Sequence, residues 1–222
     1  MYCWEVPTLA HYQSSLFAQG EPSLKDRPEF HRILLDDSTW IDLSPGWVQG
    51  ADELFASLHQ ELEWRGGSRP MYGELVKEPR LHASLSGIDQ RHAVVGSMSD
   101  FLATRYGPGI NAGFANLYRD GNDSVAWHAD RIGRHEVDPV VAIVSLGAPR
   151  KFALRPMGGG SSERFVLNSG DLLVMGGACQ HTWEHAIPKM VCAEPRMSLS
   201  FRHVPDDPGL DWWYQPEAPA TK

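Results

Sequence analysis

The sequence has few cysteines and no long apolar run. Its three cysteines, Cys3, Cys179 and Cys192, are odd in number and widely spaced, which favours reduced thiols in the cytoplasm over a disulfide framework. No Cys-x-x-Cys motif is present, and this argues against a structural zinc site. There is no apolar stretch of about 18 residues and no basic and apolar leader typical of a signal peptide. We therefore expect a cytoplasmic protein without a membrane span.

Basic residues are also in short supply, and the net charge at pH 7 is −8. This sign argues against a generic nucleic-acid binder, which usually carries an excess of Lys and Arg. The charge is uneven, because residues 113–205 carry 10 Lys and Arg against 9 Asp and Glu, while the rest carries 10 against 19. A local basic face within residues 113–205 therefore remains compatible with the composition.

The length of 222 residues suits one domain with tails. We expect an N-terminal arm over residues 1–30, a domain over 31–205 and a C-terminal tail over 206–222. Apolar spacing predicts helices over about 51–64 and 89–106, and the glycines and proline at 66–70 predict a break after the first. After residue 113 the apolar period changes to 2. This predicts eight strands, at 114–119, 125–130, 140–146, 151–155, 164–167, 172–175, 182–187 and 197–203.

Eight short strands separated by turn residues favour a sandwich or a jelly roll. Two helices that precede them predict that the helices pack on the outside of one sheet.

One stretch, residues 116–130, gathers polar side chains at strand spacing. It ends in His128-x-Asp130, and Asn116-x-Tyr118 precedes this pair. Residues i and i+2 of a strand point to the same face, so His128 and Asp130 present an imidazole and a carboxylate side by side. These are two of the three ligands in the facial triad that binds non-haem Fe(II) and leaves coordination positions open.

A His-x-acid triplet alone is a weak signal, because short motifs carry a risk of false positives. A second triplet, from His59 to Glu61, lies in a predicted helix. Residues two apart in a helix diverge by roughly 200°, so this second triplet cannot chelate a metal. A polar strand end without a metal is the alternative for His128 and Asp130.

The third ligand is expected from a distant strand. Residues 180–188 offer His181 and His185, which lie on one face by their even spacing, so the spacing cannot choose between them. Cys179 is a further candidate as a thiolate ligand, although a small core residue is the more ordinary interpretation.

The last predicted strand alternates polar Arg196, Ser198, Ser200 and Arg202 with apolar residues. An exposed charged face is the usual explanation of such a pattern. Alternatively, both arginines face into a barrel, where they need carboxylates because a buried unpaired charge is costly. Two long arginine side chains can bracket one small dicarboxylate, and the guanidinium suits bidentate carboxylate recognition.

The combined pattern resembles the AlkB family of Fe(II)- and 2-oxoglutarate-dependent dioxygenases. The matching residues, in order, are Asn116-x-Tyr118, His128-x-Asp130, His185 and Arg196-x-Ser198-x-x-x-Arg202. The similarity covers residues 40–204 and implies an α+β, mainly β fold: a double-stranded β-helix (jelly roll) with N-terminal helices on the outside. It favours His185 over His181, because the distal histidine of the family precedes a small-apolar-Pro sequence such as residues 186–188.

The resemblance also implies the ligands and the activity. Fe(II) is expected on His128, Asp130 and His185, and 2-oxoglutarate on Asn116, Tyr118, Arg196, Ser198 and Arg202, with O2 as the third participant. The implied reaction is oxidative dealkylation of N-alkylated bases in DNA or RNA, a DNA-repair activity coupled to formation of succinate. The expected partner is alkylated DNA or RNA, and the expected state is a monomer.

Residues 66–86 correspond to the nucleotide-recognition lid of the family, which implies substrate contacts for Met71, Tyr72 and Arg80. Arg164 resembles a family arginine near the substrate. Packing is the alternative role for Tyr72, and a surface charge at a strand edge is the alternative for Arg164.

The sequence departs from the family pattern at two positions. Ser198 replaces the Asn of some members, and Ile132 stands where many members have an acidic residue that helps to read the base. Together with the acidic net charge, Ile132 supports an alternative, a 2-oxoglutarate-dependent hydroxylase of a protein or small molecule. A more distant alternative is a non-catalytic jelly-roll binding protein.

Overall fold

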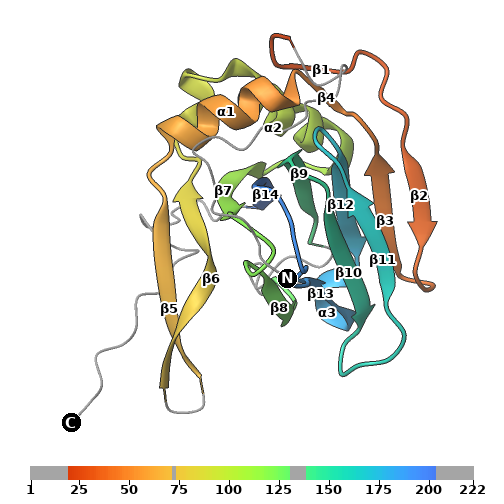
Figure 1. The fold of residues 1–222 in the computed structure, drawn as a ribbon. Helices are drawn as coiled ribbons and strands as arrows, with labels where there is room; N and C mark the ends of the chain where they lie inside the picture. The colour runs from red at the N-terminus through yellow and green to blue at the C-terminus, as the bar shows by residue number, and fades with distance from the viewer. Residues whose placement is uncertain (1–19, 72–73, 131–138, 204–222) are drawn as a thin grey trace.

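The structure, a computed structural model, describes residues 20–71, 74–130 and 139–203. Over these residues the chain forms an eight-stranded and a four-stranded antiparallel sheet (Figure 1). Strand neighbours within each sheet are mostly distant in sequence, as is typical of a jelly roll. The expected mainly β jelly-roll fold is confirmed.

The large sheet has the order β2-β3-β12-β9-β14-β7-β6-β5. Its strands are β2 (His31–Leu34), β3 (Thr39–Ser44), β12 (Leu172–Gly177), β9 (Val141–Gly147), β14 (Arg196–His203), β7 (Ile110–Tyr118), β6 (Glu74–Ser84) and β5 (Arg65–Met71). The small sheet has the order β11-β10-β13-β8, with β11 (Glu163–Leu167), β10 (Arg150–Pro156), β13 (Trp183–Ile187) and β8 (Val125–His128). A separate pair joins β1 (Ser23–Leu24) to β4 (Val48–Gln49).

Two helices, α1 (Ala51–Glu61) and α2 (Ala93–Tyr106), pack on the outer face of the large sheet against β9 and β7. Their apolar spacing gives the contact, because Leu54, Leu58, Met98 and Leu102 are all fully buried there. A short 3-10 helix, Ile88–Gln90, precedes α2. The expected packing of the helices on one sheet is therefore confirmed. No described helix is long and apolar enough to span a membrane.

A second core fills the space between the two sheets. It includes Tyr118, Phe152, Leu173 and Met175, which are at most 2 % exposed. Strand alternation separates the two cores, because Leu117 and Tyr118 are both buried although adjacent side chains of a strand point to opposite faces. One face of the large sheet thus contacts the helices, and the other faces the small sheet.

All eight strands predicted after residue 113 are present, with ends shifted by a few residues. The prediction was wrong at residues 66–70, where the expected break is part of β5. A four-residue helix, α3 (Cys179–Thr182), was not predicted. The expected C-terminal tail and most of the expected arm lie outside the described residues, so the domain limits stay predictions.

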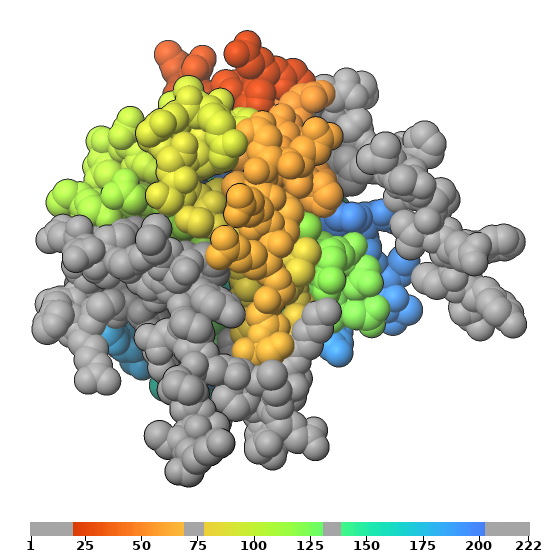
Figure 2. Space-filling model, turned by 90° about the vertical axis from the view of Figure 1, so that its left-hand side faces the viewer, coloured from red at the N-terminus to blue at the C-terminus, as the bar shows by residue number. Residues whose placement is uncertain are grey.

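Strands β5 and β6 form a hairpin that extends the large sheet past β7. In Figure 1 the hairpin projects along one side of the molecule, and in Figure 2 β5 runs down this side below α1. The hairpin belongs to the segment expected to be the lid, and it forms one wall of the cavity described next.

Candidate metal and co-substrate site

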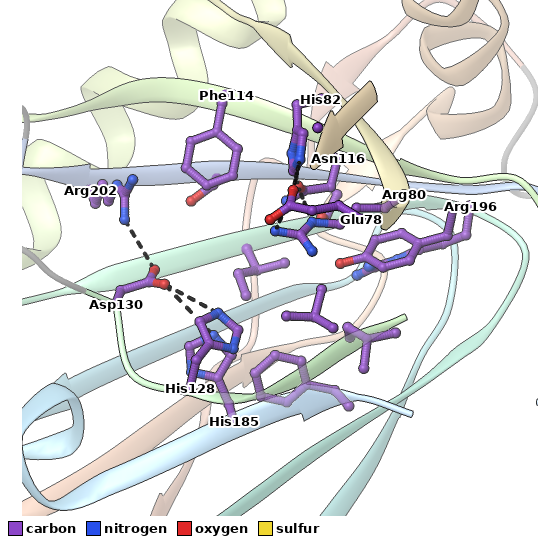
Figure 3. Close-up of a pocket in the computed structure, with 18 of the residues that line it drawn as sticks. Glu78, Arg80, His82, Phe114, Asn116, His128, Asp130, His185, Arg196 and Arg202 are labelled. Carbon is purple, nitrogen blue, oxygen red and sulfur yellow. Dashed lines mark hydrogen bonds and ion pairs between the residues drawn. The ribbon is translucent and has the colours of Figure 1, made fainter. Parts of the chain in front are cut away.

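A cavity of about 770 Å³ opens between the two sheets. Three elements build its walls: the small sheet, the inner face of the large sheet, and the β5–β6 hairpin. In Figure 3, His128, Asp130 and His185 lie on one side, and Glu78, Arg80, His82 and Asn116 lie on the opposite side. The cavity thus gathers residues that are far apart in the sequence.

The structure brings His128, Asp130 and His185 together. His128 ends β8 and pairs directly with His185 on β13, and the two ring centroids are 4.2 Å apart. Asp130 follows two residues after His128, with its Oδ1 3.5 Å from His128 Nε2 and 4.0 Å from His185 Nε2. One ligand atom from each residue lies within 4.8 Å of the others, so the group has the spacing of a metal site.

Neighbouring groups hold these three side chains in place. The Nδ1 atom of His128 donates to the carbonyl oxygen of Ala126 at 2.9 Å, which leaves Nε2 for a metal. The backbone N–H of Asp130 donates to Gln180 Oε1 at 2.8 Å. The ring of Phe152 stacks on the ring of His185, with the two ring centroids 5.4 Å apart. Gln180 and Phe152 had no role in the prediction, and only the folded chain brings them to the site.

The charges of this group suit a divalent metal. Burial raises the pKa of Asp130, but the hydrogen bond with His128 and the charges of His185 and Arg202 outweigh burial and hold the pKa well below its usual value. Burial, together with the charge of His128, lowers the pKa of His185 to about 3. A carboxylate and a neutral imidazole are the forms that bind metals. Two histidines and one carboxylate fit non-haem Fe(II).

A polar row crosses the inner face of the large sheet. His82 on β6 pairs with Asn116 on β7, Asn116 with Ser198 on β14, and Ser198 with Ser145 on β9. On β14 the alternation predicted from the sequence is present, because Arg196, Ser198, Ser200 and Arg202 are buried and line the cavity. The usual explanation of this pattern, an exposed charged face, is wrong for β14.

Arg196 lies at the inner end of this face and is 1 % exposed. Its Nε donates to Ser145 Oγ at 3.1 Å, and its guanidinium is 5.1 Å from the ring centroid of Tyr118. Within the described part of the chain, Nη1 and Nη2 have no hydrogen-bond partner. Burial lowers the pKa of Arg196 to about 10, so the group stays charged at neutral pH. A buried cation with two unpaired terminal nitrogens fits the carboxylate of a ligand.

Of the residues expected to contact the substrate, only some are found at the cavity in the described part of the chain. Arg80 lines the cavity, and its Nε donates to Asn116 Oδ1 at 3.1 Å. Arg164 is exposed on β11 and does not line the cavity. Tyr72 and Ile132 lie outside the described residues, as does the side chain of Met71.

The two other ligand candidates stand apart from the metal group. His181 is exposed on α3 and is not part of the group. Cys179 is buried in the core between the sheets, where burial raises the pKa of its thiol to about 12. A thiol with this pKa is protonated at neutral pH and is a poor metal ligand.

Glu78 and His82 line the cavity but were not predicted. His82 reaches the cavity through its register with Asn116. The sequence carries no signal for this register, because residues 74–84 lack a clear period of 2.

Comparisons with known proteins agree with this geometry. Residues 49–202 match the 2OG-Fe(II) oxygenase superfamily. The chain is 32 % identical to the human alpha-ketoglutarate-dependent dioxygenase alkB homolog 3, over 86 % of this chain and 77 % of that protein. It is 33 % identical to the DNA oxidative demethylase ALKBH2 of Arabidopsis thaliana over 44 % of this chain and 39 % of that protein, and 27 % identical to the human ALKBH2 over 69 % of each. The chain therefore belongs to the AlkB family of the 2OG-Fe(II) oxygenase superfamily.

Proposed function

We propose that this protein removes alkyl groups oxidatively from the nitrogen atoms of bases in DNA or RNA. Its family implies Fe(II), 2-oxoglutarate and O2 as the participants. One observation carries the proposal: a single cavity contains both the His128, Asp130 and His185 group and the buried Arg196, whose terminal nitrogens lack partners among the described residues. A metal site beside a buried cation suits a metal-bound ligand that ends in a carboxylate.

The protein residues bind and orient in this proposal. His128, Asp130 and His185 hold the iron, and Arg196, with Tyr118 and Ser198 beside it, receives the distal carboxylate of 2-oxoglutarate. Arg202 and Asn116 contact the part nearer the metal. Bound Fe(II) supplies the oxidation, in which 2-oxoglutarate and O2 give succinate, CO2 and one oxygen atom for the substrate. A hydroxylated N-methyl group then leaves as formaldehyde, and the unmodified base remains.

A nucleic-acid substrate is supported by the relatives, since the proteins from Arabidopsis and human with partial matches are DNA oxidative demethylases. A base inside a duplex cannot reach a cavity between two sheets, so the base has to be flipped out or supplied in a single strand. Flipping costs a few kcal/mol and is easiest for a damaged, poorly paired base. The net charge of −8 predicts weak non-specific binding with a modest salt dependence.

The test is release of formaldehyde and succinate with Fe(II), 2-oxoglutarate and methylated DNA or RNA, single- and double-stranded. Matched unmodified oligonucleotides and a reaction without oligonucleotide give the background. We expect methylated strands to raise both products in equal amounts above this background. Equal succinate formation in all three reactions, without formaldehyde, contradicts the nucleic-acid substrate.

A second candidate function keeps the chemistry and changes the substrate to a protein or small molecule. The acidic net charge and Ile132, at a position where many members have an acidic residue, favour it. The same assay separates the two candidates, because a hydroxylase of this kind consumes 2-oxoglutarate but shows no response to methylated bases. Compartment and oligomeric state stay predictions that need their own measurements.

A further inference from the structure

The side-chain amide of Asn116 has a fixed orientation. Its Oδ1 atom receives two contacts, from Arg80 Nε at 3.1 Å and from His82 Nδ1 at 2.9 Å. A guanidinium can only donate, so the atom that it contacts is the amide oxygen. The Nδ2 group has no partner within the described residues, and Asn116 lines the cavity. This residue therefore offers a hydrogen-bond donor, and not an acceptor, to a ligand.

His82 is held in its position from the other side. Its Nε2 lies 2.6 Å from Oε2 of Glu78, four residues earlier on β6. Both side chains are largely buried, at 8 % and 13 % exposed. Because Nδ1 donates to Asn116, and a contact of 2.6 Å to a carboxyl oxygen requires a hydrogen between the two atoms, both ring nitrogens are engaged. The imidazole is thus held between Glu78 on its own strand and Asn116 on β7.

Gly67 makes room for this arrangement. It lies on β5, beside the Glu78 carboxylate, and a Cβ added there would be 2.9 Å from Glu78 Oε2. That distance is too short for a real contact, so any side chain at residue 67 pushes the carboxylate away from its place. The hairpin sequence therefore accommodates the Glu78–His82 contact.

We propose that His82 is a positioning residue for the co-substrate: held by Glu78, it fixes the Asn116 amide so that Nδ2 donates to 2-oxoglutarate. This inference rests on the proposed function and names a residue outside the metal ligands and arginines. An amide free to rotate would present its oxygen to an anion in part of the population, and that contact is repulsive. Two donors on Oδ1 remove this orientation before the ligand binds, which favours binding through preorganisation.

The test is calorimetric binding of 2-oxoglutarate in the presence of Mn(II), without O2 or nucleic acid, so that no turnover occurs. We expect His82→Leu to raise the Kd about 3- to 10-fold, the range for the net loss of one ordinary hydrogen bond, because His82 acts on the ligand only through Asn116. His82→Gln should recover part of the loss, because its amide N–H can still donate to Asn116. Gly67→Ala, which removes no polar group, should weaken binding in the same direction by a smaller factor.

A double-mutant cycle separates positioning from general damage. If His82 acts through Asn116, then His82→Leu has no further effect on Kd once Asn116 is Ala. His92→Leu is the matched control, since His92 also contacts a glutamate, Glu61, at 3.1 Å but does not line the cavity. Mn(II) affinity and thermal unfolding are measured for every variant.

Two outcomes overturn the inference. One is a Kd for His82→Leu equal to that of His92→Leu, and the other is full additivity of His82→Leu and Asn116→Ala. Should His82→Leu fail to fold, an unchanged Kd in both His82→Gln and Gly67→Ala decides against it. Failure of the proposed function looks different, because methylated strands would then release no formaldehyde, while the wild-type protein would still bind 2-oxoglutarate and the Kd would still depend on His82.

Discussion

Arg202 Nη1 lies 3.3 Å from Oδ2 of Asp130 and links the last strand of the large sheet to the carboxylate of the metal group. The ring of Phe114 lies beneath this guanidinium, 4.9 Å away. Both Arg202 and Asp130 have largely buried side chains, at 7 % and 13 % exposed. The two arginines of β14 therefore have different surroundings, because Arg202 contacts a metal-group residue and Arg196 does not.

This difference predicts that Arg202→Leu weakens metal binding as well as co-substrate binding. Asp130 loses the partner that orients its second oxygen, and loss of such a partner typically costs about 10- to 100-fold in metal affinity. The measurement is Mn(II) binding in the absence of 2-oxoglutarate, by calorimetry or by the Mn(II) electron paramagnetic resonance signal. Wild-type Mn(II) affinity in this variant would contradict an orienting role for Arg202.

Replacing Arg196 is expected to weaken the binding of 2-oxoglutarate without weakening the binding of the metal. Removing one partner of a buried charge pair costs about 2–5 kcal/mol, so Arg196→Ala should raise the Kd for 2-oxoglutarate at least about 30-fold. Arg196→Lys should also be costly, because an ammonium cannot replace a bidentate guanidinium. Arg164→Lys, at an exposed position outside the cavity, is the control. If both Arg196 variants bind 2-oxoglutarate with the wild-type Kd, Arg196 does not bind a carboxylate of this ligand.

The metal group predicts a sharp contrast between two histidines of one segment. His128→Ala, Asp130→Ala and His185→Ala should each abolish succinate formation and weaken Fe(II) binding, since each removes one of three protein ligands. His181→Ala should keep measurable activity, because His181 is exposed on α3 and stands apart from the group. The assignment is wrong if His181→Ala loses iron while His185→Ala retains it.

Much of the fold was predictable because the relevant signals are local. The apolar period of 2 after residue 113 is that of strands, whose side chains alternate between two faces. The spacing of Leu54, Leu58, Met98 and Leu102 is that of helices with one apolar face packed on a sheet. Strand β5 was missed because Gly66, Gly67 and Pro70 resemble a break. Its place in the sheet comes from pairing with β6. The local strand propensity of a segment does not determine which strand it pairs with.

The site was predictable to the extent that its residues share a strand. His128 with Asp130, and Arg196 with Arg202, are linked by spacing of 2 or 6 on one strand end or face. The choice of His185 over His181 needed the family resemblance. Ser145 and Gln180 could not be found, since their contacts with Arg196 and Asp130 join residues 51 and 50 positions apart and depend on tertiary packing.

A partly buried ion pair outside the cavity, between Arg32 and the buried Asp42, predicts how stability depends on pH. Asp42 is 1 % exposed and accepts hydrogen bonds from Arg32 at 2.7 and 2.8 Å and from the hydroxyl of Tyr106 at 2.8 Å. Burial raises the pKa of Asp42, but the hydrogen bonds from Arg32 and Tyr106 outweigh burial, so that the pKa lies below 3.8. The ionised carboxylate therefore stabilises the fold above this pH, and the stabilisation is lost as the pH falls through the lowered pKa.

Asp42→Asn should therefore lower the free energy of unfolding at pH 7 by about 1–3 kcal/mol, a value limited by the half-exposed Arg32. The difference from the wild type should shrink as the pH falls below about 4. Urea unfolding at several pH values measures this. Glu63→Gln is the control, because its ion pair with Arg65 is exposed on both sides. A difference that stays constant down to pH 2 would contradict the lowered pKa.

The two arginines expected at the substrate, Arg80 and Arg164, should behave differently. Arg80 lines the cavity, whereas Arg164 is exposed on β11, opposite Ala153 of β10. An arginine inside the cavity can contact the base, and an arginine on the outer surface can contact only phosphates. We expect Arg80→Ala to lower kcat/KM for a methylated oligonucleotide about 10-fold, which corresponds to one lost contact to a base. Arg164→Ala should change it little.

Salt dependence distinguishes contact with the base from contact with the backbone. Each phosphate contact adds about 1 to the slope of log K against log salt, and a base contact adds nothing. Oligonucleotide binding followed by fluorescence anisotropy at several salt concentrations should therefore give the wild-type slope for Arg80→Ala, with weaker binding of the methylated strand. Because Arg80 also contacts Asn116, the Kd for 2-oxoglutarate is measured alongside, and a loss confined to the co-substrate would assign Arg80 to that ligand. A slope reduced by about 1 in Arg164→Ala would place a phosphate on the outer face of the small sheet, and the bound strand would then have to run across β11.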